Sequence, residues 1–293
     1  MKLAIIGVGL IGGSLGLCLK EKLGKEIFIT GLCRTEKSMQ EAMKLGAVDL
    51  ATSDLKKVVE DAEIIFLSPP VLQIVPMIKK ILPYLKPGTI LTDAGSTKSF
   101  IWNELKKILP PDIYYIAGHP MTGREKSGVD AANKNLFQNK AYVIIKDTNA
   151  PPEICEKLMK ILRLTEAKFI ELEIDKHDRC ASVISHVPHV TAAALVTLLN
   201  QAGDDLESCL KLIGGGFKDT TRIASSNADM WADICITNAD AIAANLRDLQ
   251  GILGEVIKSI DTRDRQAIHD YFAASKSRRD EILQTVEKKF DPN

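Results

Sequence analysis

Residues 2–13 of this 293-residue chain read KLAIIGVGLIGG, and this stretch decides the fold of the first half. Gly7, Gly9 and Gly12 form the pattern G-x-G-x-x-G between a strand-like run and a helix-like run, SLGLCLKEKLG. In dinucleotide-binding folds the first glycine permits a tight turn, the second lets the backbone approach a pyrophosphate, and the third lets helix and strand pack closely. The N–H groups at the start of the helix bind the phosphates. The sequence therefore predicts a dinucleotide site.

Short β-rich runs alternate with helical segments through the first half of the chain. The strand candidates are KLAIIGV, EIFITGL, AEIIFLSPP, GTILTDAG, IYYIAGHP and AYVIIKD, with a last short run near AKFIEL. Alternation of this kind predicts a parallel sheet with crossover helices. The expected fold class is an α/β Rossmann-type dinucleotide-binding domain followed by an all-α dimerisation domain.

The second half is helical almost to its end, so we place a Rossmann domain at residues 1–171 and a helical domain at 172–293. Asp175 is a candidate N-cap for a long helix that Gly203 would end, and Pro188 should kink that helix. Asn238 can cap a later helix, and a further helix is expected from about Arg263. The later helix has the apolar stripe Ile242, Leu246, Leu249, Leu253, Val256 and Ile260. Stripes this long predict a homodimer.

Composition excludes some classes of partner. Lys+Arg and Asp+Glu are both 38, so no net charge exists to attract nucleic acid or an anionic membrane. No targeting or membrane-spanning segment is evident, since glycines interrupt the apolar N-terminus. The six cysteines lie far apart without a CxxC pair, which indicates reduced thiols in a cytoplasmic protein and no metal site.

Three further segments are rich in reactive side chains. DAGSTK at 93–98 and GHPMTGREKSG at 118–128 each follow an expected strand, whereas SHVPH at 185–189 and GGGFKDTTR at 214–222 lie in the helical half. Ligands bind beyond the carboxyl ends of parallel strands, so Ser96 and His119 should face the nicotinamide end of the cofactor. Ser185 and His189 are four residues apart on a helix and share one face, from which His186 points away.

Taken together, these motifs resemble those of the prephenate and arogenate dehydrogenases from residue 1 to nearly 290. The resemblance implies a Rossmann domain and a helical dimerisation domain. It also implies that His119 is the catalytic histidine and that Ser96 hydrogen-bonds near the substrate hydroxyl and the cofactor. Arg222 matches the arginine that binds a substrate carboxylate. The remaining matches to substrate-pocket residues are Ser185, His189, Gly215, Trp231, Glu125 and His177.

The reaction implied by the resemblance suits these residues chemically. Neutral His119 would accept the hydroxyl proton of prephenate as hydride leaves for the nicotinamide, a general-base role worth about 10² to 10⁴ in rate. Loss of the ring carboxylate as carbon dioxide then makes the ring aromatic. Arg222 suits a carboxylate because its guanidinium is planar and always charged. The product would be 4-hydroxyphenylpyruvate, on the route to tyrosine.

Other functions fit parts of the pattern. Arogenate differs from prephenate only in carrying an amino group in place of the keto group, and His189 with Arg124 beside Glu125 favours prephenate. The β-hydroxyacid dehydrogenases also pair a Rossmann domain with helices, but they rely on a lysine in the helical half. A non-catalytic nicotinamide sensor would not need a histidine and an arginine converging on the nicotinamide. Tyrosine, if it inhibits, should act at the active site, since no regulatory domain is evident.

The choice between NAD and NADP depends on the end of the second expected strand. Cys33 stands where an acidic residue often binds the ribose of NAD, and Arg34 and Thr35 follow it. A guanidinium and a hydroxyl suit a 2′-phosphate, so the sequence leans to NADP or dual use, although Glu36 is close by. The expected cofactor-binding residues are Gly7, Gly9, Leu10, Ile11, Gly12, Cys33, Arg34, Thr35 and Ser68.

Overall fold

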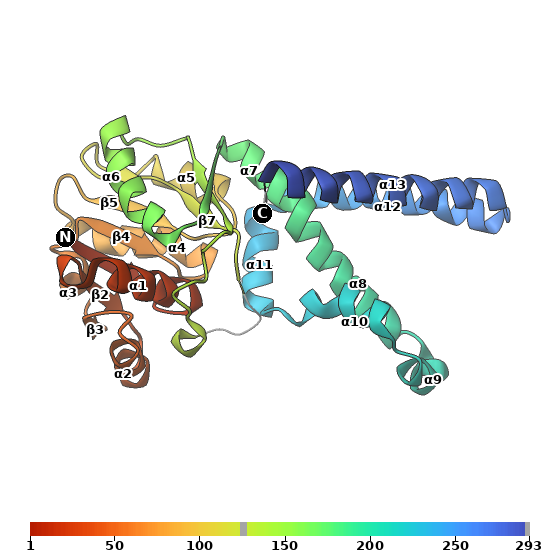
Figure 1. Ribbon diagram of the computed structural model, residues 1–293, viewed down its shortest axis with the longest axis horizontal. Coiled ribbons are helices and arrows are strands. Elements are labelled where there is room, and N and C mark those ends of the chain that lie inside the picture. The colour runs from red at the N-terminus through yellow and green to blue at the C-terminus, as the bar shows by residue number, and fades with distance from the viewer. Residues whose placement is uncertain (124–127, 291–293) are drawn as a thin grey trace. The chain divides into compact units, whose positions relative to one another are not determined.

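A computed structural model describes residues 1–123 and 128–290 (Figure 1). The chain forms two compact units, residues 1–242 and residues 243–293. The division lies well beyond residue 171, because helices of the second half pack on the sheet-containing part of the first unit. Each unit is described separately.

The main sheet of the first unit is parallel, with strand order β3-β2-β1-β4-β5-β6. The order reverses between β1 and β4, and Rossmann folds bind dinucleotides beyond the carboxyl ends of the strands at such a point. The strands are β1 Lys2–Ile6, β2 Phe28–Leu32, β3 Leu50–Thr52, β4 Ile64–Leu67, β5 Ile90–Asp93 and β6 Tyr114–Tyr115. The intervening helices are α1 Leu10–Leu23, α2 Glu36–Lys44, α3 Leu55–Val59, α4 Val71–Ile81 and α5 Ser99–Leu105.

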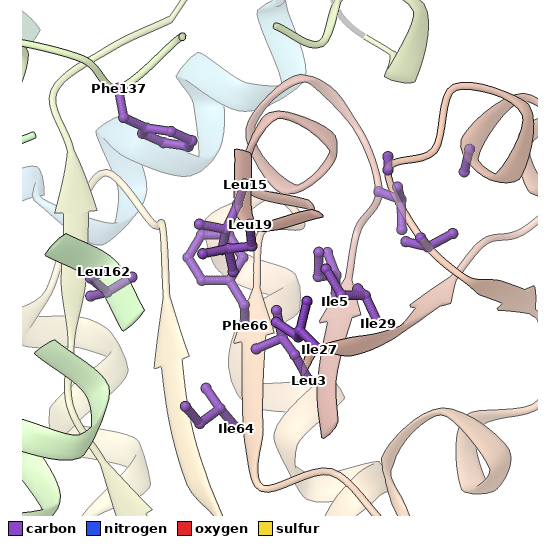
Figure 2. Close-up of a cluster of buried hydrophobic side chains, with 14 of the residues drawn as sticks. Leu3, Ile5, Leu15, Leu19, Ile27, Ile29, Ile64, Phe66, Phe137 and Leu162 are labelled. Atoms are coloured by element: carbon purple, nitrogen blue, oxygen red, sulfur yellow. The ribbon is translucent and has the colours of Figure 1, made fainter. Parts of the chain in front are cut away.

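The central strands are apolar along their whole length because helices cover both faces of the sheet. Every residue of β4 is buried. Ile5, Ile29 and Phe66 pack with Leu15 and Leu19 of α1 on one face (Figure 2). Burial of each such side chain contributes about 1.5 to 3 kcal/mol of transfer free energy. This core holds the loop after β1 against the end of β4.

A second, three-stranded sheet corrects one expectation. The run IYYIAGHP was expected to be a single strand of the parallel sheet, but it forms β6 and then β7 Gly118–Pro120, which belongs to the order β7-β8-β9. Strand β7 pairs antiparallel with β8 Ala141–Ile145, which pairs parallel with β9 Lys168–Leu172, and α6 Pro152–Leu162 lies between them in sequence. The chain changes sheets at Ile116 and Ala117: Ile116 N–H donates to Leu91, whereas the carbonyl of Ala117 accepts from Ile145.

A nearly continuous helical run follows β9. It consists of α7 Ile174–Ala181, a π-helical turn η5 Ser182–His186, and α8 Val187–Asn200. Residue Glu173, not Asp175, occupies the N-cap, and the helix ends before Gln201 rather than at Gly203. Pro188 is the second residue of α8 and has no N–H to donate to the preceding turn, and the helical run is irregular there, with the π-helical turn η5 directly before α8.

Shorter helices complete the first unit. They are α9 Leu206–Lys211, α10 Gly215–Thr221 and α11 Ala228–Thr237. The short 3₁₀ turns are η1 Gly24–Glu26, η2 Leu82–Tyr84, η3 Val129–Ala131, η4 Arg163–Thr165, η6 Gly203–Asp205 and η7 Arg222–Ser225. Helix α11 lies against α4 of the Rossmann part, and the Leu72 N–H at the start of α4 donates to Asp233 of α11 at 3.4 Å.

The second unit consists of two long helices joined by a turn at residues 262–264. Helix α12, Ala239–Asp261, enters it from the first unit, and α13, Arg265–Phe290, follows. Arg263 in the turn has a positive φ of 54°. Large apolar side chains of this unit are exposed, among them Ile252, Leu253, Ile257, Ile260, Phe272, Ile282, Leu283 and Val286. The expected apolar stripe is therefore present on α12. Within a single chain Ile242 is buried, but Leu253 and Ile260 remain exposed.

One helical run among the described residues, Ile174–Asn200, is long and apolar enough to cross a membrane by length and composition alone. Only 17% of its most apolar stretch is buried within the chain, and Ile184 and Leu198 are more than 60% exposed. The same run carries the buried polar side chains His177, Asp178 and His186, each with a polar partner. Its exposed face needs an apolar partner of some kind.

Candidate functional site

The loop after β1 has the shape that a dinucleotide requires. A Cβ on Gly12 would lie 2.4 Å from the carbonyl oxygen of Gly7 and 2.6 Å from the hydroxyl of Ser68, so no side chain fits there. A Cβ on Gly9 would meet nothing within 4 Å, which leaves open space at the start of α1. No side chain caps α1, so its first N–H groups are free for an anion.

Ser68 ties this loop to the neighbouring strand. Its hydroxyl donates to the carbonyl of Gly7 at 2.8 Å, and its backbone N–H donates to Ile6 at 2.8 Å. Leu10 and Ile11 form the partly exposed first turn of α1. The fit of this loop to a pyrophosphate therefore rests on two glycine positions, the crowded Gly12 and the open Gly9.

The end of β2 differs from what the sequence suggested. Cys33 stands directly after the strand, as expected, but its side chain is only 5% exposed and belongs to the apolar core. Burial raises the pKa of its thiol. The Thr35 hydroxyl accepts the Ser38 N–H at 3.1 Å and so caps α2. Arg34 is exposed like Thr35, but unlike Thr35 it caps no helix.

His119 lies in β7 at the start of a chain of three polar side chains. Its Nδ1 atom is 2.8 Å from Nε2 of His177 in α7, and Nδ1 of His177 is 2.8 Å from Oδ1 of Asp178. All three residues are buried, at 9%, 2% and 4% exposure. The two imidazole rings meet edge to face at 67°.

The carboxylate at the end of this chain fixes the protons on both rings. Asp178 accepts, so Nδ1 of neutral His177 carries the hydrogen and its Nε2 is an acceptor. Nδ1 of His119 must then donate to His177, which leaves Nε2 of His119 with a free lone pair. A neutral His119 in this tautomer is a base at Nε2.

Burial favours the neutral form of this base. It holds the pKa of His119 well below its ordinary value of 6.5, and the nearby His177, Lys98 and His186 act in the same direction. The pKa of Asp178 also lies below its usual value. Burial acts to raise it, but hydrogen bonds from His177 and Ser99 outweigh that effect. The hydrogen-bonded chain therefore joins a neutral His119, through His177, to an ionised carboxylate.

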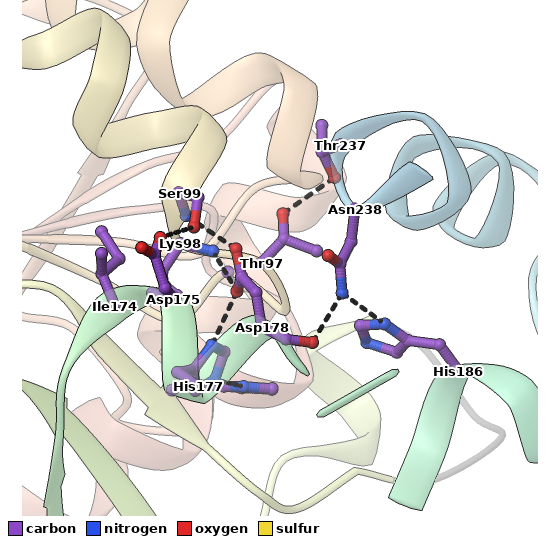
Figure 3. A network of polar contacts seen from close by, with 12 residues as sticks. Thr97, Lys98, Ser99, Ile174, Asp175, His177, Asp178, His186, Thr237 and Asn238 are labelled. Carbon is purple, nitrogen blue, oxygen red and sulfur yellow. Dashed lines mark hydrogen bonds and ion pairs between the residues drawn. The ribbon is translucent and has the colours of Figure 1, made fainter. Parts of the chain in front are cut away.

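The segment before α5 anchors Asp178. The backbone N–H groups of Lys98 and Ser99 donate to its two carboxylate oxygens at 2.9 and 2.8 Å (Figure 3). The Asn238 amide donates to the Asp178 carbonyl at 2.9 Å and to Nδ1 of His186 at 3.1 Å. The Thr97 hydroxyl donates to Thr237 at 2.8 Å. The DAGSTK segment therefore joins the Rossmann part to α7 and α11.

A second group of expected residues gathers on the helices. Nδ1 of His189 donates to the Ser185 carbonyl at 2.8 Å, and the His189 ring stacks on Trp231 with ring centres 3.9 Å apart. Burial lowers the pKa of His189, the hydrogen bond to Ser185 opposes this, and Arg222 lowers it further. Arg222 is therefore close enough to His189 to act on its charge. The Trp231 indole N–H is buried without a partner among the described residues.

Comparisons with known proteins agree with this geometry. A family model described as prephenate dehydrogenase, nucleotide-binding domain, matches residues 15–171, and one described as prephenate dehydrogenase, dimerization domain, matches residues 173–274. A prephenate dehydrogenase of Lactococcus lactis is 35% identical over 277 residues, which are 94% of this chain and 75% of that protein. The chain belongs to the prephenate dehydrogenase family.

Two solved structures have the same architecture. Prephenate dehydrogenase from A. aeolicus, in complex with hydroxyphenyl propionate and NAD+, is 29% identical with a TM-score of 0.88, covering 96% of this chain and 98% of that one. Arogenate dehydrogenase from Synechocystis is also 29% identical, with a TM-score of 0.81, covering 96% and 100%. The expected Rossmann domain with a helical domain, and a nicotinamide-dependent prephenate dehydrogenase, are confirmed.

In this member of the prephenate dehydrogenase family, some of the expected site residues make no described contact with the other site residues. Ser96 is partly buried in the loop after β5, and Gly215 is exposed at the start of α10, where a Cβ would meet only Asp219, at 3.9 Å. Arg124 and Glu125 lie outside the described residues. His186, expected to be structural, is 1% exposed and bonded to Asn238.

Sequence reasoning missed Asp178 and Lys98, although both contribute to the site. Asp178 directly follows His177 in the sequence, and Lys98 ends the DAGSTK motif that supplied Ser96. An acid next to a histidine in a motif-rich helix was the signal available for Asp178. For Lys98 a lysine would ordinarily be assigned to the surface, so no sequence pattern marked it as buried.

Proposed function

We propose that this chain oxidises and decarboxylates prephenate to 4-hydroxyphenylpyruvate with His119 as the general base. The observation that carries this proposal is the hydrogen-bonded chain from His119 through His177 to Asp178. It presents a neutral imidazole with Nε2 unprotonated. Such a group is suited to taking a proton from a hydroxyl while hydride leaves the same carbon.

The protein groups act in a defined order. Nε2 of His119 accepts the proton of the ring hydroxyl as the C–H bond on that carbon breaks. The chemistry that NAD or NADP supplies when bound is acceptance of the hydride. The bond between the ring and its carboxylate then breaks, its electrons enter the ring, and carbon dioxide leaves. His119 returns its proton to the phenolate, so the histidine ends the cycle neutral.

The positive charge that develops on His119 is spread along the chain. Its Nδ1–H points at Nε2 of His177, which can take that proton while its own Nδ1–H remains bound to Asp178. An imidazolium beside the Asp178 carboxylate is stabilised by that negative charge. Ser96 orients the substrate hydroxyl in this proposal, which its place in the loop after β5 supports.

The helical residues are proposed to hold the substrate. Arg222 binds the ring carboxylate through its planar fork, and His189 and Ser185 bind the pyruvyl end. Trp231 supports His189 through the 3.9 Å stack. Gly215 and His177 complete the pocket, and Glu125 is proposed to do so as well. With its ring carboxylate held by Arg222, the substrate would present its reacting carbon to His119.

Arogenate is the alternative substrate. His189 is the residue proposed to distinguish the two substrates, because it would contact the end at which they differ. Arogenate offers an ammonium where prephenate offers a keto group. The test is a two-by-two assay of prephenate or arogenate with NAD or NADP, followed by absorbance at 340 nm. A kcat/KM at least about tenfold higher for prephenate supports the proposal. A preference of that size for arogenate would replace it.

For the cofactor, NAD binding follows from the nucleotide-binding domain, and we propose that the chain also uses NADP. The support is Arg34, which is exposed beyond the end of β2 and suits a 2′-phosphate. The buried thiol of Cys33 offers no carboxylate to the ribose of NAD. The proposed reader of the phosphate is therefore Arg34, not Cys33 or Thr35.

We propose that residues 172–293 bind the substrate and form a homodimer. The match to a dimerization domain over 173–274 supports this, and so do the exposed apolar side chains on α12 and α13. Light scattering should give about twice the 32.1 kDa of one chain. A mass of one chain at assay concentrations would refute the dimer. With the apolar face of Ile174–Asn200 covered by a second copy, no membrane is required.

Two smaller proposals complete the account. Tyrosine, which resembles the product, inhibits by competing with prephenate at the active site; inhibition that does not weaken with rising prephenate would contradict this. The protein resides in the cytoplasm, because its six cysteines are free thiols that suit a reducing compartment. Fractionation of cells with an antibody to the chain tests the location.

A further inference from the structure

A fully buried lysine lies behind the base. Lys98 has 0% exposure, and its Nζ forms an ion pair with Asp93, which is also 0% exposed. Nζ donates in addition to the carbonyl of Gly118 at 2.6 Å. Replacing a buried ion pair by apolar side chains is often neutral or stabilising, so stability alone is a weak reason to keep it. Nothing in the reaction as described above uses this ammonium.

Lys98 touches the catalytic chain at both of its ends. Its ammonium binds the carbonyl of Gly118, the residue before His119 in β7. Its backbone N–H binds the carboxylate of Asp178, which terminates the chain from His119 through His177. His119 and His177 link these two contacts through their hydrogen bonds. A shift of Lys98 would therefore move the base and its last partner together.

We propose that Lys98 is a positioning residue that fixes His119 in its productive place, with the ammonium holding the backbone before the base and the N–H holding Asp178. The rest of the buried cluster holds Lys98 itself. The Tyr115 hydroxyl donates to Asp93 at 2.8 Å, and Gly95 N–H donates to the other oxygen of Asp93 at 2.9 Å. The Gly118 N–H donates to Asp93 as well, at 3.4 Å, so with the ammonium Asp93 has four donors, and it orients the ammonium toward Gly118.

The charge of Lys98 also acts on the base. The groups facing His119 are His177 on α7, His186 on η5 and Lys98 before α5, and each lowers its pKa in addition to burial. The titratable groups that interact with Lys98 are Asp93, Asp178 and His119. Burial lowers the pKa of Lys98, and Asp93 opposes that effect. Burial, and then Asp93, raises the pKa of Tyr115 well above its usual value, so its hydroxyl stays a donor.

The test compares Lys98→Met with Lys20→Met. Its kinetic measurements rest on the proposed function, because they use prephenate as the substrate. Lys20 is a matched control because it also pairs with an aspartate, Asp49 at 2.7 Å, and donates to backbone carbonyls, but it lies on α1 away from His119. In the double variant Lys98→Met/Asp93→Asn the amide oxygen still accepts from the Gly95 N–H, the amide N–H can donate to the Tyr115 hydroxyl, and no buried carboxylate is left unpaired. Folding is checked by circular dichroism.

For the kinetics we expect kcat with prephenate to fall about tenfold or more in Lys98→Met and in the double variant, with the KM for NAD nearly unchanged. The acid limb of the kcat profile should move to higher pH, because His119 loses a neighbouring positive charge. The control should keep both values. A folded Lys98 variant with kcat within about threefold of wild type and an unmoved limb would overturn the proposal.

A second readout does not need turnover. Histidine ¹⁵N NMR of the protein without substrate reports the tautomer and titration of His119. In Lys98→Met we expect a higher titration midpoint and loss of the single Nδ1–H tautomer, with the control unchanged. An identical His119 spectrum would refute the positioning role. If wild type turns over neither prephenate nor arogenate, the proposed function fails, while this spectrum still decides the role of Lys98.

Discussion

Nδ1 of His119 lies 2.8 Å from Nε2 of His177, and this contact decides which nitrogen of His119 can act as a base. The carboxylate of Asp178 accepts from the other side of His177, so the hydrogen between the two rings belongs to His119. Its Nε2 is left unprotonated. Through the same hydrogen bonds, the positive charge that His119 gains can be shared with His177, which lies beside the Asp178 carboxylate.

The tautomer predicts the effect of Asp178→Asn. The substitution replaces one carboxylate oxygen by an amide nitrogen, so either the Lys98 N–H or the Ser99 N–H loses its acceptor. With the nitrogen in place of Oδ1, the amide donates to Nδ1 of His177, which would place a hydrogen on Nε2 of His177 and reverse the contact with His119. The base would then carry its hydrogen on Nε2, toward the substrate. We expect kcat to fall by about 10²-fold or more, as when a triad aspartate is replaced.

Asp175→Asn is the control for that experiment. Asp175 lies on the same helix and is exposed, and its one described partner is the Ser99 hydroxyl at 3.5 Å. Its kcat should stay near that of wild type. Equal losses in the two variants would show that the effect arises from α7 as a whole and not from the tautomer.

The pH dependence of kcat in wild type follows from the environment of His119. The base must be neutral, so kcat rises with pH through the pKa of His119 and is level above it. Burial first, and then His177, Lys98 and His186, hold that pKa well below 6.5. At saturating prephenate we therefore expect a level kcat from pH 6.5 upward. An acid limb centred above 6.5 would be inconsistent with the buried neutral base.

His189 predicts that the choice of substrate depends on pH. Its Nδ1–H is bound to the Ser185 carbonyl, so Nε2 of neutral His189 is an acceptor, which suits the ammonium of arogenate. Protonated His189 donates from Nε2, which suits prephenate. Burial lowers the pKa of His189, Ser185 opposes this, and Arg222 lowers it further.

The ratio of kcat/KM for prephenate to that for arogenate should therefore fall as pH rises through the lowered pKa of His189, with the midpoint of the change below 6.5. The ratio cancels the titration of His119, which serves both substrates. In His189→Leu the ratio should become independent of pH. A constant ratio in wild type would remove His189 from substrate discrimination.

Arg222→Ala is expected to raise the KM for prephenate about tenfold or more and to leave the KM for NAD nearly unchanged, because the ring carboxylate loses a bidentate partner. Lysine should rescue poorly, since it lacks the planar fork. Arg34→Ala provides the matched comparison, an arginine removed from the cofactor end. If Arg222→Ala affects both KM values equally, the side chain supports the fold and not the substrate.

Arg34→Ala also tests the cofactor proposal. Loss of the guanidinium should lower kcat/KM for NADP about tenfold and leave that for NAD nearly unchanged. Cys33→Ser is the control, because the side chain of Cys33 packs in the core and should not affect the choice of cofactor. Unchanged use of NADP in Arg34→Ala would mean that another group binds the 2′-phosphate.

Much of the fold could be predicted from local patterns. The glycine motif and the apolar runs gave β1, β2, β4, β5 and β8 because each run is long enough to be a buried strand. The exit of the chain from the main sheet at Ile116 was not predictable, since a backbone that changes sheets keeps the same apolar composition. Three-residue strand β3 was too short to show a pattern.

The site was predicted unevenly, for reasons that residue type explains. His119 and His189 stood out because they lie in the quoted motifs, and His177 came only from the family resemblance, whereas Lys98 looked like any surface lysine. The orientation of Cys33 could not be predicted. In the structure Ile29 and Gly31 of β2 are buried, Phe28 is exposed, and Cys33 continues the buried positions, but the sequence FITGL has apolar residues at both kinds of position and so does not show this alternation.

The central claim is that His119 is the base, and the most direct measurement is the rate of NADH formation from prephenate by wild type and His119→Asn. Asparagine keeps hydrogen bonding but cannot accept the proton. We predict that kcat falls by about 10² to 10⁴, while the Kd for NAD, measured by titration, stays nearly the same. A folded His119→Asn protein with kcat close to that of wild type would contradict the account.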